Sequence, residues 1–218
     1  MKQIWLNLGS GIRLLSNFIN VDFAYTFEEL KNKDPKKGLQ DAEIDKGAEY
    51  VMADMRKLPF KDDSVDYILA FTSIEHLPIA HVVPTLIEWR RVLKKTGEMV
   101  FVTTNFDELA YIWLNSLSTN AEDFAKSNID LNSFKAISET IYGNQQAKGE
   151  YHMCPFNPKI INWMMNQSGW PYWELGVYPT GRETPKHKGY PGSGYTCLFG
   201  ELHVKGYKRI PESVKITK

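Results

Sequence analysis

The sequence predicts an α/β fold whose core is a mostly parallel β-sheet with helices on both faces. Short apolar segments typical of buried strands alternate along the chain with helical or loop connectors. These segments are apolar over almost their whole length, which suits a sheet that is covered on both sides. At 218 residues and 43% hydrophobic content, the chain can bury a sizeable core, and no linker divides it. We therefore expect a single domain over residues 1–218.

Seven segments have the composition of strands. Each is apolar and stops at a Gly, Asp, Thr or a turn-rich stretch. The expected strands are residues 4–8, 18–21, 49–53, 65–71, 99–103, 172–177 and 195–204. A stretch rich in Gly, Pro and Lys lies between the last two strands, and we expect it to be a loop.

Helical periodicity is clearest over residues 79–95, where apolar residues recur every three or four positions. A second helix is expected over residues 157–167, because Pro158 suits the first turn of a helix. Residues 26–47 are polar and indicate surface helix and loop. Residues 105–147 are polar and helical in pattern, without a strong strand.

The charge balance disfavours some classes of partner. Lys and Arg number 26, as do Asp and Glu, so the formal net charge is +0. A nucleic-acid binder normally has a basic excess, and a membrane-surface protein has clustered Lys and Arg. No apolar run approaches the ~18 residues that a membrane span needs, and the first residues do not resemble a signal peptide. We expect a cytoplasmic protein that does not bind membranes.

Cysteine and histidine patterns predict neither a disulfide framework nor a metal site. Cys154 and Cys197 could form one bridge, but nothing requires it, and a reduced chain fits equally well. The five histidines and two cysteines show no ligand spacing such as H-x₃-H or C-x₂-C. No metal is therefore expected.

Residues with ligand-binding chemistry follow four successive strands. They are Gly9-Ser10-Gly11, Asp22, Asp54 and Thr72-Ser73. Glycines allow a backbone to approach a ligand closely, and an acidic residue after the second strand accepts hydrogen bonds from a ribose in Rossmann-type sites. Open parallel sheets bind their ligands at this edge. Each Asp alone could equally be a turn or N-cap residue.

The ordered motifs resemble the class I S-adenosylmethionine-dependent methyltransferases. The motifs are LNLGSG, NVD, ADMRKLPFKDDSVDYILAFTSIEHL and LIEWRRVLKKTGEMVFVTT. The likeness is greatest to small bacterial and phage methyltransferase-domain proteins with a shortened first helix. It is close over residues 4–104 and resumes loosely in HMCPFNPKIINWMMNQSGW. It implies a Rossmann-like, seven-stranded, mostly parallel sheet with an antiparallel last strand, and a helical insertion over residues 105–150 that covers the acceptor site.

The resemblance also implies a cofactor, S-adenosylmethionine, with S-adenosylhomocysteine as product. Asn7, Gly9, Ser10 and Gly11 would form the loop under its methionine part, and Asp22 would hold its ribose hydroxyls. Asp54 and the backbone of Met55 would meet the adenine. Phe71, Thr72 and Ser73 would line the methionine side near the methyl group. Only eight residues separate Gly11 from Asn20, so we expect a first helix of two turns at most.

Methyl transfer gains mainly from the positioning of the two reactants, and a hydroxyl or amine acceptor also needs a general base. The catalytic candidates are His76 and His152, with His81 and Glu75 as further candidates. For His76 the alternative is packing and a structural hydrogen bond, and Glu75 could simply cap a helix.

We expect a small-molecule acceptor rather than a nucleic acid. Residues 180–218 contain eight basic and three acidic residues, a balance of +5, which keeps an acidic or nucleic-acid substrate open. A second alternative is a non-catalytic cofactor-binding or interaction subunit. A third is an NAD-binding protein, but Leu14 stands where that fingerprint has its third glycine.

Overall fold

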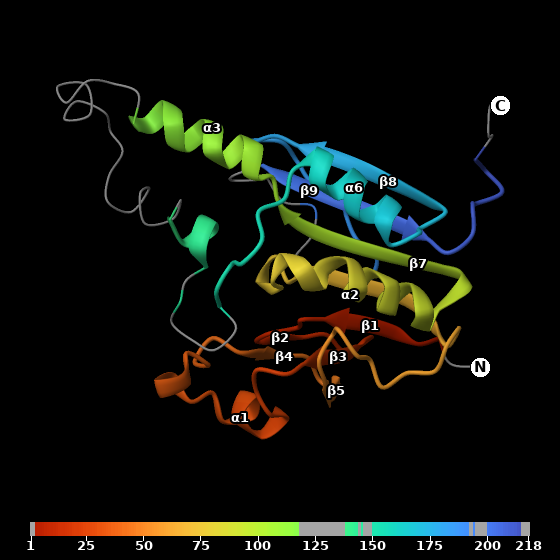
Figure 1. Cartoon of the computed structure of the whole chain (residues 1–218). Helices are drawn as coiled ribbons and strands as arrows, with labels where there is room; N and C mark the ends of the chain where they lie inside the picture. Colours follow the sequence, from red (N-terminus) through yellow and green to blue (C-terminus); the bar gives the residue numbers. More distant parts are fainter. Residues whose placement is uncertain are drawn as a thin grey trace.

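The computed structural model describes residues 3–117, 138–143, 145, 150–191, 194 and 200–214. Its centre is a seven-stranded sheet with the order β5-β3-β1-β6-β7-β9-β8 (Figure 1). The strands are β1 (Trp5–Leu8), β3 (Ile19–Asp22), β5 (Glu49–Met52), β6 (Val65–Phe71), β7 (Leu93–Thr104), β8 (Tyr172–Tyr178) and β9 (Glu201–Tyr207). The strands from β5 to β7 are parallel, and β9 runs antiparallel to both its neighbours. The predicted mostly parallel sheet with an antiparallel last strand is confirmed.

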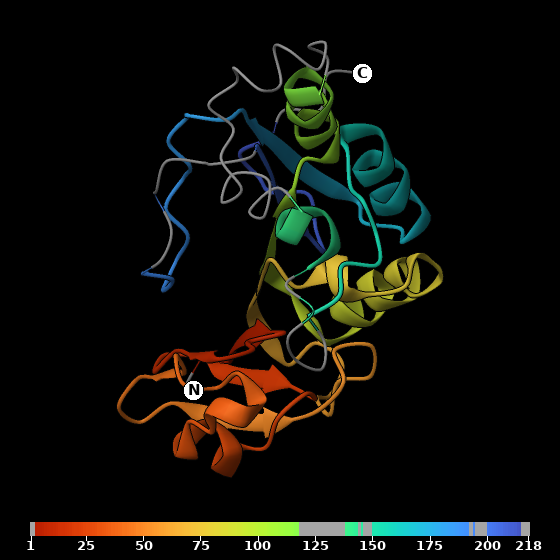
Figure 2. The same cartoon turned by 90° about the vertical axis from the view of Figure 1, so that its left-hand side faces the viewer.

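Helices lie on both faces of this sheet. They are α1 (Phe27–Asn32), α2 (Ile79–Val92), α3 (Phe106–Leu117) and α6 (Pro158–Gln167). Helices α2 and α6 pack on the face that contains Leu8, Val21 and Phe101, where they build the largest core. Side chains alternate between the two faces of a strand, so Asn20 points away from the face that contains its neighbour Val21. Tyr50 is in register with Asn20 and therefore also lies on the opposite face. There it stacks on Phe27 of α1. Figure 2 shows α1 and α3 at opposite ends of the molecule.

Helix α2 ends three residues earlier than the sequence pattern predicts. It stops at Val92, and β7 begins at Leu93, where it pairs with Val65 before the register shifts. The Lys208 ammonium donates to the carbonyl oxygens of Arg91 and Leu93, at 3.2 and 2.9 Å. A distant residue thus satisfies carbonyl groups near the helix end, which the local sequence could not indicate.

The expected first helix between Gly11 and Asn20 is wrong. This segment instead contains β2 (Arg13–Leu14), which pairs in parallel with β4 (Glu43–Ile44). The fully buried Asn20 side chain takes the place of helical hydrogen bonds. Its amide accepts from the Leu15 N–H at 2.9 Å and donates to the Leu15 carbonyl at 3.0 Å and to the Glu49 carbonyl at 2.8 Å. Backbone groups bonded in this way are unavailable to a helix.

Two further expectations fall partly outside the described residues. Of the insertion expected at 105–150, the structure describes α3 and a helical turn at 138–142, while residues 118–137 lie outside. Residues 195–199 of the last expected strand also lie outside, as does Cys197, and the Cys154 thiol is buried and unpaired. Within the described part of the chain, no helix has the length and apolar character needed to cross a membrane.

Candidate functional site

A cavity of about 740 Å³ opens at the edge of the sheet where β1, β3 and β6 end. Parallel strands bring their carboxyl ends to one edge, so the loops that follow them meet there. Glu139, Thr140, Gly143, Glu150 and His152 also line this cavity. Among the residues expected to bind a cofactor, those that line the cavity are Gly9, Ser10, Gly11, Asp22, Met55, Phe71, Thr72 and Ser73.

The glycine loop is shaped by close packing. Gly9 has a φ of +64°, and a Cβ added there would lie 2.4 Å from the Cβ of Ser73, so no larger residue fits. Its N–H donates to the Val21 carbonyl at 2.8 Å, which joins the loop to β3. Gly11 also has a positive φ, +51°, but a Cβ there would meet nothing within 4 Å. The loop is therefore packed at Gly9 and open at Gly11.

The Asp22 carboxylate organises this loop and also lies in the cavity wall. One oxygen accepts from the Gly11 N–H at 2.8 Å, and the other accepts from the Ala24 N–H at 2.8 Å. An ionised carboxylate has about four lone-pair sites, so both oxygens retain capacity for a ligand. The geometry allows Asp22 to hold a diol while it fixes the loop.

Two further features of the wall fit a bound polar ligand. The Ser10 hydroxyl is buried and has no hydrogen-bond partner among the described residues. Buried polar groups are normally paired, so a ligand atom in the loop would meet this need. Thr72 adopts a φ of +44°, unusual for a non-glycine residue, and its N–H donates to the Val102 carbonyl at 2.9 Å. Such backbone strain concentrates at ligand sites.

The structure does not bring Asn7 and Asp54 to the cavity wall. Asn7 is buried beneath the loop and donates to the Arg13 carbonyl and to Asn20. The Asp54 carboxylate is bound by the guanidinium of Arg56, with the shortest contact at 2.6 Å. The neighbours of Asp54 in the chain, Ala53 and Met55, line the cavity instead.

Phe23 is a wall residue that the sequence reasoning missed. It follows Asp22 directly, lines the cavity and is 40% exposed. An exposed aromatic ring beside the Asp22 carboxylate is suited to pack against a flat ring system. Its position immediately after the acidic residue was the available signal.

The structure brings His76 and His152 together. Their ring centroids are 4.7 Å apart in an edge-on arrangement, and both line the cavity. His152 Nδ1 lies 2.8 Å from the Thr140 carbonyl oxygen. A carbonyl can only accept, so Nδ1 of the neutral ring bears the hydrogen and Nε2 is the basic nitrogen. Burial, and then the neighbouring His76, lower the pKa of His152, which favours the neutral ring.

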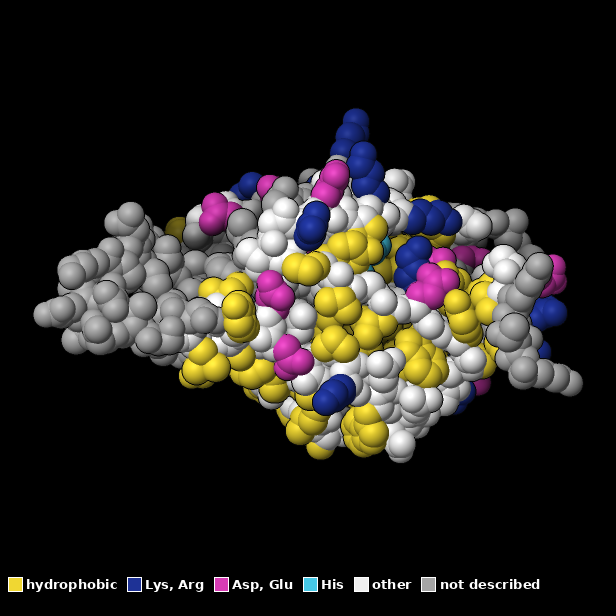
Figure 3. All heavy atoms as spheres, turned by 90° about the horizontal axis from the view of Figure 1, so that it is seen from above, with side chains coloured by type: hydrophobic (Ala, Val, Ile, Leu, Met, Phe, Trp, Pro, Cys, Tyr) yellow, Lys and Arg dark blue, Asp and Glu magenta, His cyan; other side chains and the backbone are white. Residues whose placement is uncertain are grey.

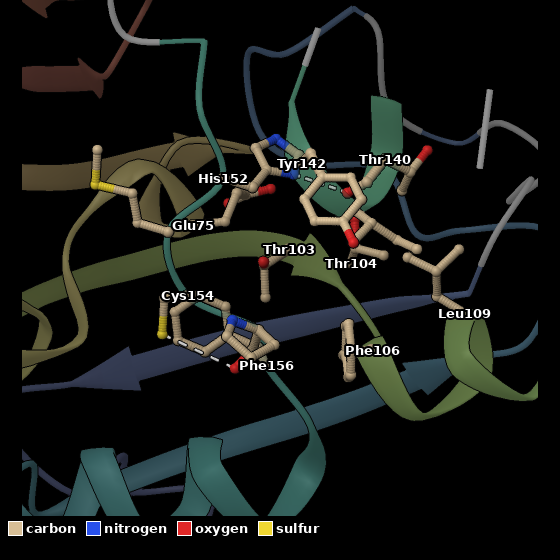
Figure 4. Close-up of a pocket in the computed structure, with 13 residues that line it drawn as sticks. Glu75, Thr103, Thr104, Phe106, Leu109, Thr140, Tyr142, His152, Cys154 and Phe156 are labelled. Atoms are coloured by element: carbon tan, nitrogen blue, oxygen red, sulfur yellow. Dashed lines mark hydrogen bonds between the residues drawn. The ribbon is translucent and has the colours of Figure 1, made fainter. Parts of the chain in front are cut away.

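A second, smaller pocket of about 220 Å³ adjoins the first (Figure 4). The two share Glu75, Thr104, Thr140 and His152 in their walls. Glu75 is buried, and burial raises the pKa of its carboxyl to about 7. The structure therefore joins a large cavity to a small one through a buried carboxyl group and a neutral histidine.

The large cavity has an acidic wall. Its carboxylates are Asp22, Asp41, Glu75, Glu139 and Glu150. Arg13 also lines it, but its guanidinium is held by Glu43 at 3.2 Å and Asp45 at 2.9 Å. Such a wall favours a cationic ligand. Among the described residues, no group of three His, Cys, Asp or Glu is placed to hold a metal ion.

Tyr190 of the basic C-terminal segment lines the cavity, but none of the segment's described Lys and Arg residues does. Lys208 pairs with Asp63 at 2.7 Å, and Lys188 lies 4.1 Å from the centre of the Trp5 ring. On the face seen in Figure 3, Lys and Arg side chains are scattered among hydrophobic ones.

Comparisons with known proteins agree with this geometry. Residues 6–101 match the family model described as a methyltransferase domain. A SAM-dependent methyltransferase from Thermotoga maritima, described as a possible histamine N-methyltransferase, has 16% identity and a TM-score of 0.53, with 96% of this chain and 83% of that chain covered. One from Archaeoglobus fulgidus has 12% identity and a TM-score of 0.53, with coverage of 94% and 86%. One from Methanosarcina mazei has 12% identity and a TM-score of 0.51, with coverage of 96% and 95%. No curated protein matches the sequence.

Proposed function

We propose that this chain is a class I S-adenosylmethionine-dependent methyltransferase and that it transfers a methyl group from that cofactor to a small-molecule acceptor. The match of residues 6–101 to a methyltransferase-domain model and the fold shared with solved methyltransferases support the proposal. The main support is the large cavity, where a glycine loop and Asp22 meet at the carboxyl edge of the sheet. S-adenosylmethionine supplies a methyl group activated on a positively charged sulfonium. The acidic wall favours that charge.

The residues of the wall suit the separate parts of this cofactor. Asp22 has lone-pair sites for the ribose hydroxyls, and Phe23 and Met55 offer apolar surface for the adenine. The loop from Gly9 to Gly11, with the unpartnered Ser10 hydroxyl, would lie under the methionine part. Phe71, Thr72 and Ser73 would line the side nearest the methyl group.

The size and charge of the adjoining pocket support a small acceptor. Its volume of about 220 Å³ is modest, and a carboxyl group lies in its wall. Negative charge in both cavities disfavours a phosphate backbone, whose binding depends on Lys and Arg contacts. A small molecule that is neutral or cationic fits this environment better than a nucleic acid.

His152 is the general base of this proposal, and His76 orients it. The hydrogen bond from His152 Nδ1 to Thr140 fixes the ring and leaves Nε2 to take a proton. His76 Nδ1 lies 3.0 Å from the Tyr151 carbonyl, which fixes the second ring against the first. Replacing either residue by Ala should lower kcat and shift its pH profile while the KM for S-adenosylmethionine is unchanged. Unchanged turnover across pH would exclude this role.

Calorimetry with S-adenosylhomocysteine tests the cofactor assignment. The protein should bind it, and Asp22→Ala should weaken binding at least about tenfold, because hydrogen bonds to a charged group are lost. Asp62→Ala is the matched control, since Asp62 is an exposed carboxylate paired with Arg91 outside the cavity. Failure of the unmodified protein to bind the nucleoside would contradict the proposed function.

A further inference from the structure

Glu75 lies at the junction of the two cavities and is held there by its own backbone. It belongs to a 3₁₀ turn (Ile74–His76) that follows β6. The Glu75 carbonyl oxygen accepts from the N–H groups of Met153 and Cys154, at 2.8 and 3.2 Å. The turn is thereby fixed to the segment before α6. The side chain has its place in the wall of both cavities because two distant parts of the chain meet at this residue.

The Glu75 carboxyl group has unused hydrogen-bonding capacity. Neither of its oxygens has a partner of standard geometry among the described residues, and the nearby Thr103 hydroxyl is also unpartnered. The side chain is only 3% exposed. An unpaired buried polar group costs free energy unless a ligand satisfies it. Two buried acceptor oxygens in a pocket wall therefore indicate a ligand that donates hydrogen bonds.

The rest of the small pocket is mainly apolar. Phe106, Leu109 and Phe156 contribute rings and an aliphatic side chain to its wall, and Tyr142 adds another ring (Figure 4). In Figure 4, Glu75 and Phe106 lie toward opposite sides of the pocket, with Thr103 drawn between them. This arrangement fits a molecule with an apolar body and a polar group that donates hydrogen bonds at one end.

On the premise of the proposed function, we propose that the small pocket binds an amine acceptor with an apolar body, whose nitrogen is held by the Glu75 carboxylate. An ammonium group donates up to three hydrogen bonds, whereas a hydroxyl donates one. The Asp22, Asp41, Glu139 and Glu150 side chains in the adjoining cavity favour a cation and disfavour an anion. An amine meets both the donor requirement and the charge requirement.

The same carboxylate can prepare the amine for reaction. An ammonium nitrogen has no lone pair, so it must lose one proton before it can accept a methyl group. Transfer of that proton to a Glu75 oxygen turns an anion and a cation into two neutral groups, which burial favours. The exchange balances: the nitrogen gives one proton to Glu75 and then gains one methyl group. His152, the general base of the proposed function, takes the proton that the methylated ammonium loses when it leaves as a neutral amine.

The groups that face Glu75 support this proton transfer. Burial raises the pKa of its carboxyl to about 7, and the negative charge of Glu201 on β9 adds to the rise. The backbone N–H of Glu75 and the Thr103 hydroxyl lie close enough to lower that pKa, without reversing the rise. Burial, and then Glu75 itself, raise the pKa of the neighbouring Cys154 thiol to about 11, so this thiol stays neutral. Burial and His76 lower the pKa of His152, another titratable residue of this wall, which favours its neutral form.

The test is calorimetric binding of benzylamine and of benzyl alcohol, which has nearly the same shape without the amine. At pH 8 the unmodified protein should bind benzylamine at least about tenfold more tightly, because hydrogen bonds between charged groups are strong. Glu75→Gln should abolish this preference. The matched control Asp62→Asn should retain it, because Asp62 is paired with Arg91 and lies in the wall of neither cavity.

A pH series on the unmodified protein gives a second readout, which does not depend on any variant folding. With a pKa of about 7, the ionised fraction of Glu75 rises from about one tenth at pH 6 to about nine tenths at pH 8. Affinity for benzylamine should therefore rise about tenfold over this interval, while affinity for benzyl alcohol should not.

Two results would overturn the proposal: equal affinity for the two probes, or a preference that survives Glu75→Gln. Binding of S-adenosylhomocysteine is measured on the same samples. This measurement tests the proposed methyltransferase function separately from the amine-binding role of Glu75. If the unmodified protein does not bind S-adenosylhomocysteine, the proposed function is contradicted. The preference for benzylamine is measured without nucleoside, so it still decides whether Glu75 binds an amine.

Discussion

Replacing Glu75 by Gln should stabilise the free protein at high pH and leave its stability unchanged at low pH. The substitution keeps the shape of the side chain and removes its ability to ionise. Because the folded-state pKa is raised from 4.5 to about 7, the folded protein binds this proton more tightly than the unfolded chain. Stability of the native protein must then fall as pH rises from about 4.5 to about 7, and stay level above that range.

The size of the effect follows from the same values. Each tenfold change in proton affinity corresponds to about 1.4 kcal/mol, so a rise from 4.5 to about 7 corresponds to about 3 kcal/mol at pH 8. Urea denaturation at pH 4.5, 6 and 8 would measure the free energy of unfolding for both proteins. The difference between them should be close to zero at pH 4.5 and reach about 3 kcal/mol in favour of Glu75→Gln at pH 8.

A matched control is Glu174→Gln, which alters an exposed glutamate on β8. This variant should follow the unmodified protein at every pH. The reasoning is refuted if the free energies of Glu75→Gln and the unmodified protein differ by the same amount at pH 4.5 and pH 8. That result would show that Glu75 ionises in the folded protein as readily as in the unfolded chain.

Three further predictions concern the cofactor cavity and its support. Gly9→Ala should abolish binding of S-adenosylhomocysteine, because the new Cβ would lie 2.4 Å from the Cβ of Ser73. Gly11→Ala should lower the free energy of unfolding by only about 1 kcal/mol, the cost of backbone strain. Calorimetry measures the binding of both variants, and urea denaturation measures their stability. Asn20→Leu should lower the free energy of unfolding by about 3 kcal/mol in urea denaturation, since it leaves buried backbone groups unpaired. Asp54→Ala should weaken nucleoside binding by less than about threefold, because Arg56 holds the carboxylate outside the cavity wall. A loss of affinity of about tenfold or more would show that this carboxylate contacts the ligand.

The sequence was sufficient to predict the sheet and the edge at which the cavity opens. The signals for strands are local, because the residue at which an apolar run stops, such as Gly9 or Asp22, marks the end of the strand. Parallel strands then place those boundaries at one edge without any knowledge of packing. This is why eight of the ten residues expected to bind the cofactor line a single cavity.

The features that sequence reasoning missed depend on partners far along the chain. The expected first helix fails because Asn20 bonds to the backbone of Leu15 and Glu49, which no local pattern indicates. Asp54 has a plausible position after a strand, but Arg56 occupies its carboxylate. From its local sequence Glu75 could be a helix-capping residue. Its place in the cavity wall could not be predicted, because the turn that contains it is bonded to Met153, which is 78 residues away.

The short connection between β1 and β3 also affects how the chain folds. Leu6 and Ile19 are paired across these strands although only 13 positions separate them, whereas Trp5 and Tyr67, paired across β1 and β6, are 62 positions apart. Closing a short loop costs less chain entropy, and contacts between near neighbours in sequence form faster. We expect β1 and β3, with the glycine loop between them, to associate before β6 joins. The part of the chain proposed to bind the cofactor would then form early and template the rest of the sheet.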